Sequence, residues 1–378
     1  MKTAKMFLVT LAALSMAACS NNDEIPGMNN DGTKSVSLRL DGLATSSRAI
    51  GDAQKAGQIA LSNLTVYFTD GTNILAKKSL STANTAEWDE LTGEGHVFHQ
   101  LPSAVSQIQI VGNSTGKTIT EGTVAALKAS VLKAAGEQEF TNVTLFGEDT
   151  SLESQAPQVS DDHTDDVLKA EVPLSPLVAR FEIGNIACTD LGTGPVKQFD
   201  LSVIGLMDFN SGVTLAGTAS GTEYTLDNVL EPGSQAVQGK VIFGEADENA
   251  GWAWDKISGA TNITSSTPWN PGESGDKKFV YQFIPNKITG NKMAQVKLVL
   301  DNVKWTDGTN NPFNSVVTAK FQKDGVDLTE FQAGKIYTVD YQFRGENVGP
   351  WNPDDVKCVQ INVTVANWEV VALTPVFE

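Results

Sequence analysis

The C-terminal stretch, residues 357–378, constrains the fold of this chain more than any other segment. Its first part carries β-branched residues at every second position, Val359, Ile361, Val363 and Val365. This is the period of a β-strand. After Asn367 the apolar residues resume and continue almost to the last position, with Trp368, Val370, Val371, Leu373, Val376 and Phe377. Because chain ends are usually polar and frayed, we expect this one to be buried, either in the same molecule or in another.

The N-terminal residues have the features of a targeting segment. Lys2 and Lys5 supply positive charge, and residues 6–18 form an apolar run that is too short to span a bilayer as a mature helix. Small residues then precede Cys19, a pattern that resembles the lipobox of bacterial lipoproteins and implies cleavage before Cys19 and its acylation. The polar residues 20–24 resemble the surface-export signal of lipoproteins in Bacteroidota-type bacteria. An ordinary secretory signal with an incidental cysteine is the alternative.

The composition is that of an acidic, globular chain. With 378 residues, of which 40% are hydrophobic, the chain is long enough for two domains with their own cores. The formal net charge of −18 disfavours nucleic acid and anionic lipid surfaces as partners. The simpler interpretation of this charge is that it keeps a surface protein soluble.

Alternating apolar residues predict β-strands along most of the chain. The first strand has Val36, Leu38 and Leu40 on one face, and a small polar linker with Arg48 follows it. Such a linker is exposed and accessible to proteases. A dense apolar run at residues 172–183 is expected to open a second domain. Other strands are predicted at residues 64–68, 97–101, 107–111, 141–146, 199–206, 240–243, 279–284, 294–303, 316–321 and 336–343.

Two segments between these strands have a different character. Residues 121–135 are the best helix candidate, because apolar residues recur there at helical spacing. Residues 155–166 are polar, with four aspartates around His163, and they predict a surface loop. Short strands separated by loops in this way are typical of antiparallel sandwiches.

Three patterns raise the question of catalysis or metal binding. Residues 112–116 match the nucleophile-elbow pattern G-x-S-x-G at Ser114, but the only downstream histidine is His163, and a plain turn is the better interpretation. His96 and His99 lie three apart on a predicted strand, so they point to opposite faces and do not share a metal. The aspartates around His163 lack the spacing and glycine of an EF-hand. We therefore expect no enzymatic activity, cofactor or metal site.

The remaining aromatic and thiol residues leave alternatives open. Trp252, Trp254 and Trp269 lie in a Gly/Ser/Asn-rich region, where they form either a sugar-stacking platform or, as we favour, packing aromatics. Cys188 and Cys358 sit in apolar-alternating runs. Buried free thiols are the default there, and a disulfide in an oxidising compartment is the alternative.

These features together resemble the fimbrillins, the major subunits of Bacteroidota-type (type V) pili. The most specific part is the ending Val-Thr-Val-Ala-Asn-Trp-Glu-Val-Val at residues 363–371. Residues 111–116, 177–183 and 334–339 also resemble family segments: a turn before a helix, the strand that opens the second domain, and the strand before the final linker. The resemblance covers nearly the whole chain except residues 208–274.

The resemblance implies a mainly β fold with two antiparallel, transthyretin-like β-sandwich domains and a few short helices. The expected organisation is a lipoprotein signal peptide (1–18), a lipidated propeptide with a cleavable first strand (19–48), an N-terminal domain (49–168), a C-terminal domain (169–345), and a linker with the donor strand (346–378).

The resemblance also implies a mechanism of assembly. The precursor is lipidated at Cys19, anchored to the outer membrane and cut by a trypsin-like surface protease between Arg48 and Ala49. The strand with Val36, Leu38 and Leu40 is then displaced. A neighbouring subunit fills its place with a C-terminal donor strand, for which Trp368, Val370, Val371, Leu373, Val376 and Phe377 are the candidates. The expected partners are copies of the chain and other pilus subunits.

Three roles are compatible with the sequence. A protease-accessible arginine, Arg48, together with the apolar tail favours a stalk subunit of a cell-surface pilus that supports adhesion. An anchor subunit would keep its lipid and remain uncut. A glycan-binding surface lipoprotein would account for the signal and the sandwiches, but it gives no reason for Arg48 or for the apolar C-terminus.

Overall fold

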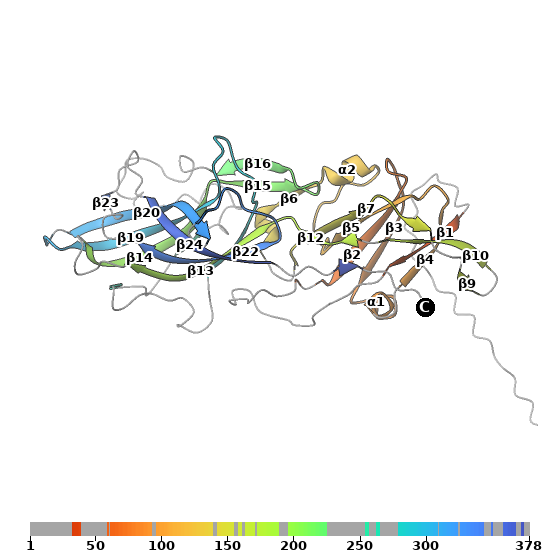
Figure 1. The fold of residues 1–378 in the computed structure, drawn as a ribbon, viewed down its shortest axis with the longest axis horizontal. Coiled ribbons are helices and arrows are strands. Elements are labelled where there is room, and N and C mark those ends of the chain that lie inside the picture. The colour runs from red at the N-terminus through yellow and green to blue at the C-terminus, as the bar shows by residue number, and fades with distance from the viewer. Residues whose placement is uncertain are drawn as a thin grey trace, which may run out of the picture.

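The computed structural model describes residues 32–38, 59, 61–92, 96–138, 142–154, 158–160, 163–170, 172–188, 196–224, 254–256, 262–264, 279–308, 310–323, 326–343, 349–350, 358–367 and 372–373. Within these residues the chain is mainly β, which confirms the fold class predicted from the sequence. Its sheets form two sandwiches that lie end to end (Figure 1). Among the described helices, none is long and apolar enough to cross a membrane.

The N-terminal sandwich consists of two sheets. One has the strand order β4-β1-β10-β8, with β9 paired to β10, and the other has the order β12-β7-β5-β2-β3. The rings of Phe68 and Phe98 meet edge-on at 5.2 Å between the two sheets. The elements are β1 (Gly32–Leu38), β2 (Asn63–Thr69), β3 (Ile74–Ser81), α1 (Thr85–Thr92), β4 (His96–Pro102), β5 (Gln107–Gly112), α2 (Val124–Lys128), β6 (Val131–Lys133), η1 (Ala134–Glu137), β7 (Leu145–Asp149), β8 (Glu153–Ser154), β9 (Gln158–Ser160), β10 (His163–Lys169), β11 (Val172–Pro173) and β12 (Ser175–Pro176).

The C-terminal sandwich is built from one continuous set of strands, in the order β17-β14-β19-β20-β24-β22-β13-β18. The elements of this half of the chain, some of which pair outside that set, are β13 (Ala179–Cys188), β14 (Val196–Met207), β15 (Phe209–Thr214), β16 (Ala219–Tyr224), β17 (Trp254–Lys256), β18 (Phe279–Phe283), β19 (Gln295–Trp305), β20 (Asn310–Lys323), β21 (Val326–Asp327), β22 (Lys335–Phe343), β23 (Gly349–Pro350), β24 (Cys358–Asn367) and β25 (Ala372–Leu373). Most described pairs are antiparallel, as predicted, but β1–β10, β13–β22 and β20–β24 are parallel.

Strand pairing and side-chain hydrogen bonds join the two sandwiches. β6, which follows α2, pairs with β15 in a small sheet with the order β16-β15-β6. Gln138, directly after η1, donates from Nε2 to the carbonyl oxygen of Gln282 in β18 at 2.8 Å. Gln282 returns a bond from its own Nε2 to the carbonyl oxygen of Gln138 at 3.1 Å. This reciprocal pair fixes the end of η1 to the edge of the C-terminal sandwich.

The helix predicted at residues 121–135 is only partly present. Thr123 caps α2 by accepting a bond from the amide of Ala126, and the helix ends at Lys128. Ser130 then accepts a bond from the amide of Thr120 through its hydroxyl, and residues 131–133 become β6. The prediction was wrong here because pairing with β15 outweighs the helix propensity of this Ala- and Lys-rich segment.

An aromatic cluster fills the C-terminal core and supports β13. The ring of Phe181 stacks on Phe283 with centroids 4.3 Å apart and meets Phe331 edge-on at 5.1 Å. Phe181 is fully buried. We expect Phe181→Ala to lower the free energy of unfolding of this sandwich by about 3–5 kcal/mol, since it removes a ring and leaves a cavity. Denaturant titration of purified protein measures the loss, with Phe181→Leu as a milder control. A loss for Phe181→Ala no larger than for Phe181→Leu would contradict this account.

Candidate functional site

The first strand of the chain lies in the interior of its sheet. β1 runs antiparallel to β4 on one side, with Val36 opposite Phe98 and Leu38 opposite His96. On its other side it runs parallel to β10, with Val36 opposite Leu168. We call the space between β4 and β10 the β1 slot. Without β1, both neighbours would present unpaired backbone groups along this slot.

β1 is buried on both faces. The side chains of Val36 and Leu38, each 0% exposed, belong to the core of the N-terminal sandwich. Ser35 and Ser37 alternate with them on the opposite face and are 0% and 1% exposed. The β1 slot therefore takes large apolar side chains on its inner face and small ones on its outer face.

Polar contacts tie β1 to β4 and to the loop after it. The hydroxyl of Ser35 and Nδ1 of His99 share a hydrogen bond at 3.1 Å. Lys34 donates from Nζ to the carbonyl oxygen of Val105 at 2.8 Å. Opposite Ser35, β4 carries an extra residue, and Gln100 there has a φ of 57°, so this side of the slot contains a bulge.

The C-terminal stretch divides between the two sandwiches. β24 passes from one ladder of the C-terminal sandwich to another: its first half pairs in parallel with β20 and its second half pairs antiparallel with β22. Five residues further on, β25 pairs with β11, where Leu373 lies opposite Val172. Val172 belongs to the same buried cluster as Val36 and Leu38. The two described tail residues therefore pair with a strand that contributes to the N-terminal core of their own molecule.

Several predicted site residues lie outside the described part of the chain. These are the signal peptide, the lipidation and cleavage positions, and most of the tail: Cys19, Leu40, Arg48, Ala49, Trp368, Val370, Val371, Val376 and Phe377. The strand predicted at residues 240–243, together with Trp252 and Trp269, also lies outside it. Of the predicted displaced strand, Val36 and Leu38 are in place in β1.

The sequence did not predict β10, the strand on one side of the β1 slot. Residues 155–166 were expected to form a surface loop, but β9 and β10 are strands, and β10 begins at His163. The prediction failed because backbone pairing with β1 and β9 orders this acidic segment. The available signal was the apolar pair Val167 and Leu168 at its end, both buried.

Ser114 lies in a turn, as interpreted from the sequence. Asn113 precedes it with a φ of 54°, and its side chain accepts a bond from the amide of Ser62 at 3.0 Å and donates to the carbonyl oxygen of Val143 at 2.9 Å. The amide of Lys117 closes the turn on the carbonyl oxygen of Ser114 at 3.0 Å. Residues 112–116 therefore form a turn that is held in place by the buried side chain of Asn113.

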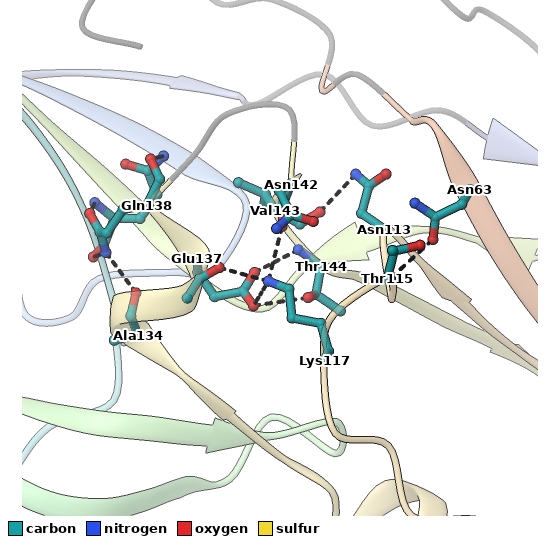
Figure 2. A network of polar contacts seen from close by, with 12 residues as sticks. Asn63, Asn113, Thr115, Lys117, Ala134, Glu137, Gln138, Asn142, Val143 and Thr144 are labelled. Carbon is teal, nitrogen blue, oxygen red and sulfur yellow. Dashed lines mark hydrogen bonds and ion pairs between the residues drawn. The ribbon is translucent and has the colours of Figure 1, made fainter. Parts of the chain in front are cut away.

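Below this turn lies a buried ion pair (Figure 2). Lys117 donates from Nζ to Oε1 of Glu137 at 2.5 Å and to the carbonyl oxygen of Asn142 at 3.0 Å. Thr144 donates to the same carboxylate from its amide and its hydroxyl. Burial raises the pKa of the Glu137 carboxyl, against the opposing effects of Lys117 and Thr144. The network holds η1, which contacts the C-terminal sandwich, to the N-terminal sandwich.

The histidines have separate partners. Nδ1 of His96 lies 2.8 Å from a carboxylate oxygen of Glu90, whereas His99 contacts Ser35 of β1. Within the described residues, no group of three or more His, Cys, Asp or Glu side chains is placed to hold a metal ion. The strands of Cys188 and Cys358 are not neighbours in the sheet, because β22 lies between β13 and β24.

Comparisons with known proteins agree with this architecture. No family model matches the sequence, and no curated protein is significantly similar to it. The structure is similar to that of a candidate cell adhesion protein from Bacteroides eggerthii DSM 20697, with 16% identity, coverage of 93% of this chain and 100% of that chain, and a TM-score of 0.54. It is also similar to a fimbrilin from Porphyromonas gingivalis W83, with 10% identity, coverage of 93% and 100%, and a TM-score of 0.52. The chain has the fimbrillin-type fold, as its sequence resemblance implied.

The buried ion pair gives a direct test of the packing below the turn. We expect Lys117→Met to lower the free energy of unfolding by about 3–5 kcal/mol, because it leaves the carboxylate of Glu137 buried without its cation. A carboxyl whose pKa is raised by folding stabilises the fold at low pH and loses that contribution as pH rises. The deficit should therefore be smaller at about pH 5 than at about pH 8.

The matched control is the double variant Lys117→Met with Glu137→Gln, which removes both charges and should recover part of the loss at the higher pH. Denaturant unfolding at the two pH values measures all three proteins. A deficit for Lys117→Met that is the same at both pH values would show that the charge of Glu137 is not its cause.

Proposed function

We propose that this chain is the stalk subunit of a cell-surface pilus that supports adhesion. The subunit is exported as a lipoprotein acylated at Cys19 and anchored to the outer membrane. A trypsin-like surface protease cuts it after Arg48, so that the mature subunit begins at Ala49. It then polymerises by inserting its C-terminal strand into the β1 slot of a neighbouring copy.

The observation that carries this proposal is the position of β1. β1 precedes the proposed cleavage site at Arg48. It is not an edge strand of its sheet, because it is hydrogen-bonded to β4 on one side and to β10 on the other. Removal of β1 would expose the part of the core that surrounds Val36 and Leu38. It would also leave the backbone groups of β4 and β10 that face the slot without hydrogen-bond partners. Each of these two side chains contributes about 1.5–3 kcal/mol of burial energy, so the vacated slot would strongly favour a replacement strand.

The arrangement of the tail supports the same function. β24 pairs with β20 along its first half and with β22 along its second half, so residues 358–367 are paired within their own sandwich. The apolar residues beyond it form only the short β25 within the described residues. A strand paired within its own sandwich and followed by an apolar segment is what a donor strand requires.

The solved structures of similar fold point in the same direction, since one is described as a fimbrilin and another as a candidate cell adhesion protein. Such proteins are structural, and we accordingly propose that the chain has no enzymatic activity. Its partners would be copies of itself and other subunits of the pilus. The acidic surface, with a net charge of −18, fits a location exposed to water at the cell surface.

Cleavage at Arg48 is the step most open to test. We expect Arg48→Ala to leave the subunit cell-bound, lipidated and unable to join filaments, because β1 then stays in its slot. Arg48→Lys is the matched control, since a trypsin-like protease also cuts after lysine, and it should restore filament formation. Filament yield after shearing, together with the mass of the cell-bound subunit, measures both variants.

Normal filaments from the Arg48→Ala strain would contradict the proposed processing. A wild-type subunit that stays uncut and acylated would instead identify the chain as an anchor, or as a surface lipoprotein outside the pilus. Binding to glycan arrays would then be the next measurement, directed at the region around Trp252, Trp254 and Trp269.

A further inference from the structure

We propose that the two sandwiches fold and unfold as one cooperative unit, because the C-terminal half of the chain completes the core of the N-terminal sandwich. The hairpin of β15 and β16 joins them, since its tip, residues 213–217, docks on the segment that runs from α2 to η1. We call this hairpin the brace. The inference concerns the uncut chain and goes beyond the pilus function proposed above.

The backbone of the brace bonds to the N-terminal half of the chain. β15 pairs with β6, and Figure 1 shows the brace beside β6 and α2. Beyond the end of β15, the amide of Leu215 donates to the carbonyl oxygen of Ser130 at 3.0 Å. The amide of Ala216 donates to the carbonyl oxygen of Lys128, the last residue of α2, also at 3.0 Å. The brace therefore supplies a donor to the C-terminal end of this helix, where carbonyl groups have no partner within the helix.

The side chains of the brace enter the N-terminal core. Val213 and Leu215 are 0% and 1% exposed and belong to the buried cluster that contains Val36 and Leu38 of β1. Leu132 of β6, directly opposite Val213, belongs to the same cluster. Because burial of a valine or leucine side chain stabilises the folded state, the N-terminal core depends on residues that lie far beyond it in the sequence.

Other residues of the C-terminal half join this shared cluster. Val178 directly precedes β13, Ile284 directly follows β18 and Ile336 lies in β22, and all three side chains are buried. β18 and β22 also carry Phe283 and Tyr337, whose rings belong to the aromatic cluster of the C-terminal core. The cores of the two sandwiches therefore meet at β18 and β22.

Polar contacts fix the brace to its own sandwich. Asn286 donates from Nδ2 to the carbonyl oxygen of Gly217 at the tip, and Asn210 of β15 donates from Nδ2 to the carbonyl oxygen of Asn286, both at 3.3 Å. The reciprocal bonds of Gln138 and Gln282 join the two halves at a second point. Because the halves are joined at two points and share a buried cluster, opening of one sandwich exposes apolar surface of the other, and their free energies of unfolding are coupled.

The shared cluster would matter for the proposed processing. Loss of β1 would remove Val36 and Leu38 from the cluster, whereas Val213, Leu215 and Ile284 come from the other half of the chain and would stay. The brace would then help to keep the rest of the N-terminal sandwich folded around an open slot.

Hydrogen exchange followed by mass spectrometry tests the coupling in the uncut chain. Leu298 of β19 is 0% exposed and lies outside the shared cluster. We expect Leu298→Ala to lower amide protection at least about tenfold in β2 and β5 as well as in β14 and β19, because both sandwiches open together. Leu298→Val, a smaller truncation, should give the same pattern with a smaller loss.

A second substitution tests the brace itself. Leu215→Ala should lower amide protection at least about tenfold in both sandwiches, because it removes a buried side chain from the shared cluster. The matched control is Thr218→Ala, at an exposed position of the same hairpin, which should leave protection unchanged.

Two results would overturn the proposal. Loss of protection confined to β14 and β19 in Leu298→Ala would show that the sandwiches are independent units. Equal protection in Leu215→Ala and Thr218→Ala would show that the brace does not support the N-terminal core. Neither result would contradict the pilus function, which depends on the processing of Arg48 and is tested separately.

Discussion

The pairing of β1 with β4 and β10 is the interaction on which the N-terminal sandwich depends. β1 completes the backbone ladder on two sides and contributes Val36 and Leu38 to the core. β1 precedes Arg48 in the sequence, and residues 39–58 connect it to the next described residue, Ile59. Under the proposed processing, cleavage at Arg48 would separate β1 from the rest of the chain and leave the N-terminal sandwich with an open slot that requires a replacement strand.

The remainder of the described molecule connects this site to β24 in the other sandwich. β24 connects the strands on the β20 side of the C-terminal sandwich to those on the β22 side. The two sandwiches are in turn joined by β6 with β15 and by the paired amides of Gln138 and Gln282. The ion pair of Lys117 and Glu137 secures the segment between these contacts.

The sequence predicted those features that have a local signature. Period-two alternation located β1 through Val36 and Leu38, and it located β24 through its run of β-branched residues. The turn at Ser114 followed from its glycines. Features that depend on distant pairing were missed. β10 carries aspartates that indicate a loop, and its pairing with β1, β8 and β9 makes it a strand. The segment at Val131 has helical spacing, and only β15 draws it into a sheet. Both misses arise because strand pairing acts through the backbone and leaves little trace in the side chains.

The central claim is that β1 is removed and replaced when subunits assemble. The most direct measurement is the N-terminal sequence and intact mass of this protein in filaments sheared from cells. The account predicts a subunit that begins at Ala49 and carries no lipid. A filament subunit that begins at an acylated Cys19 and still contains residues 32–38 would contradict it.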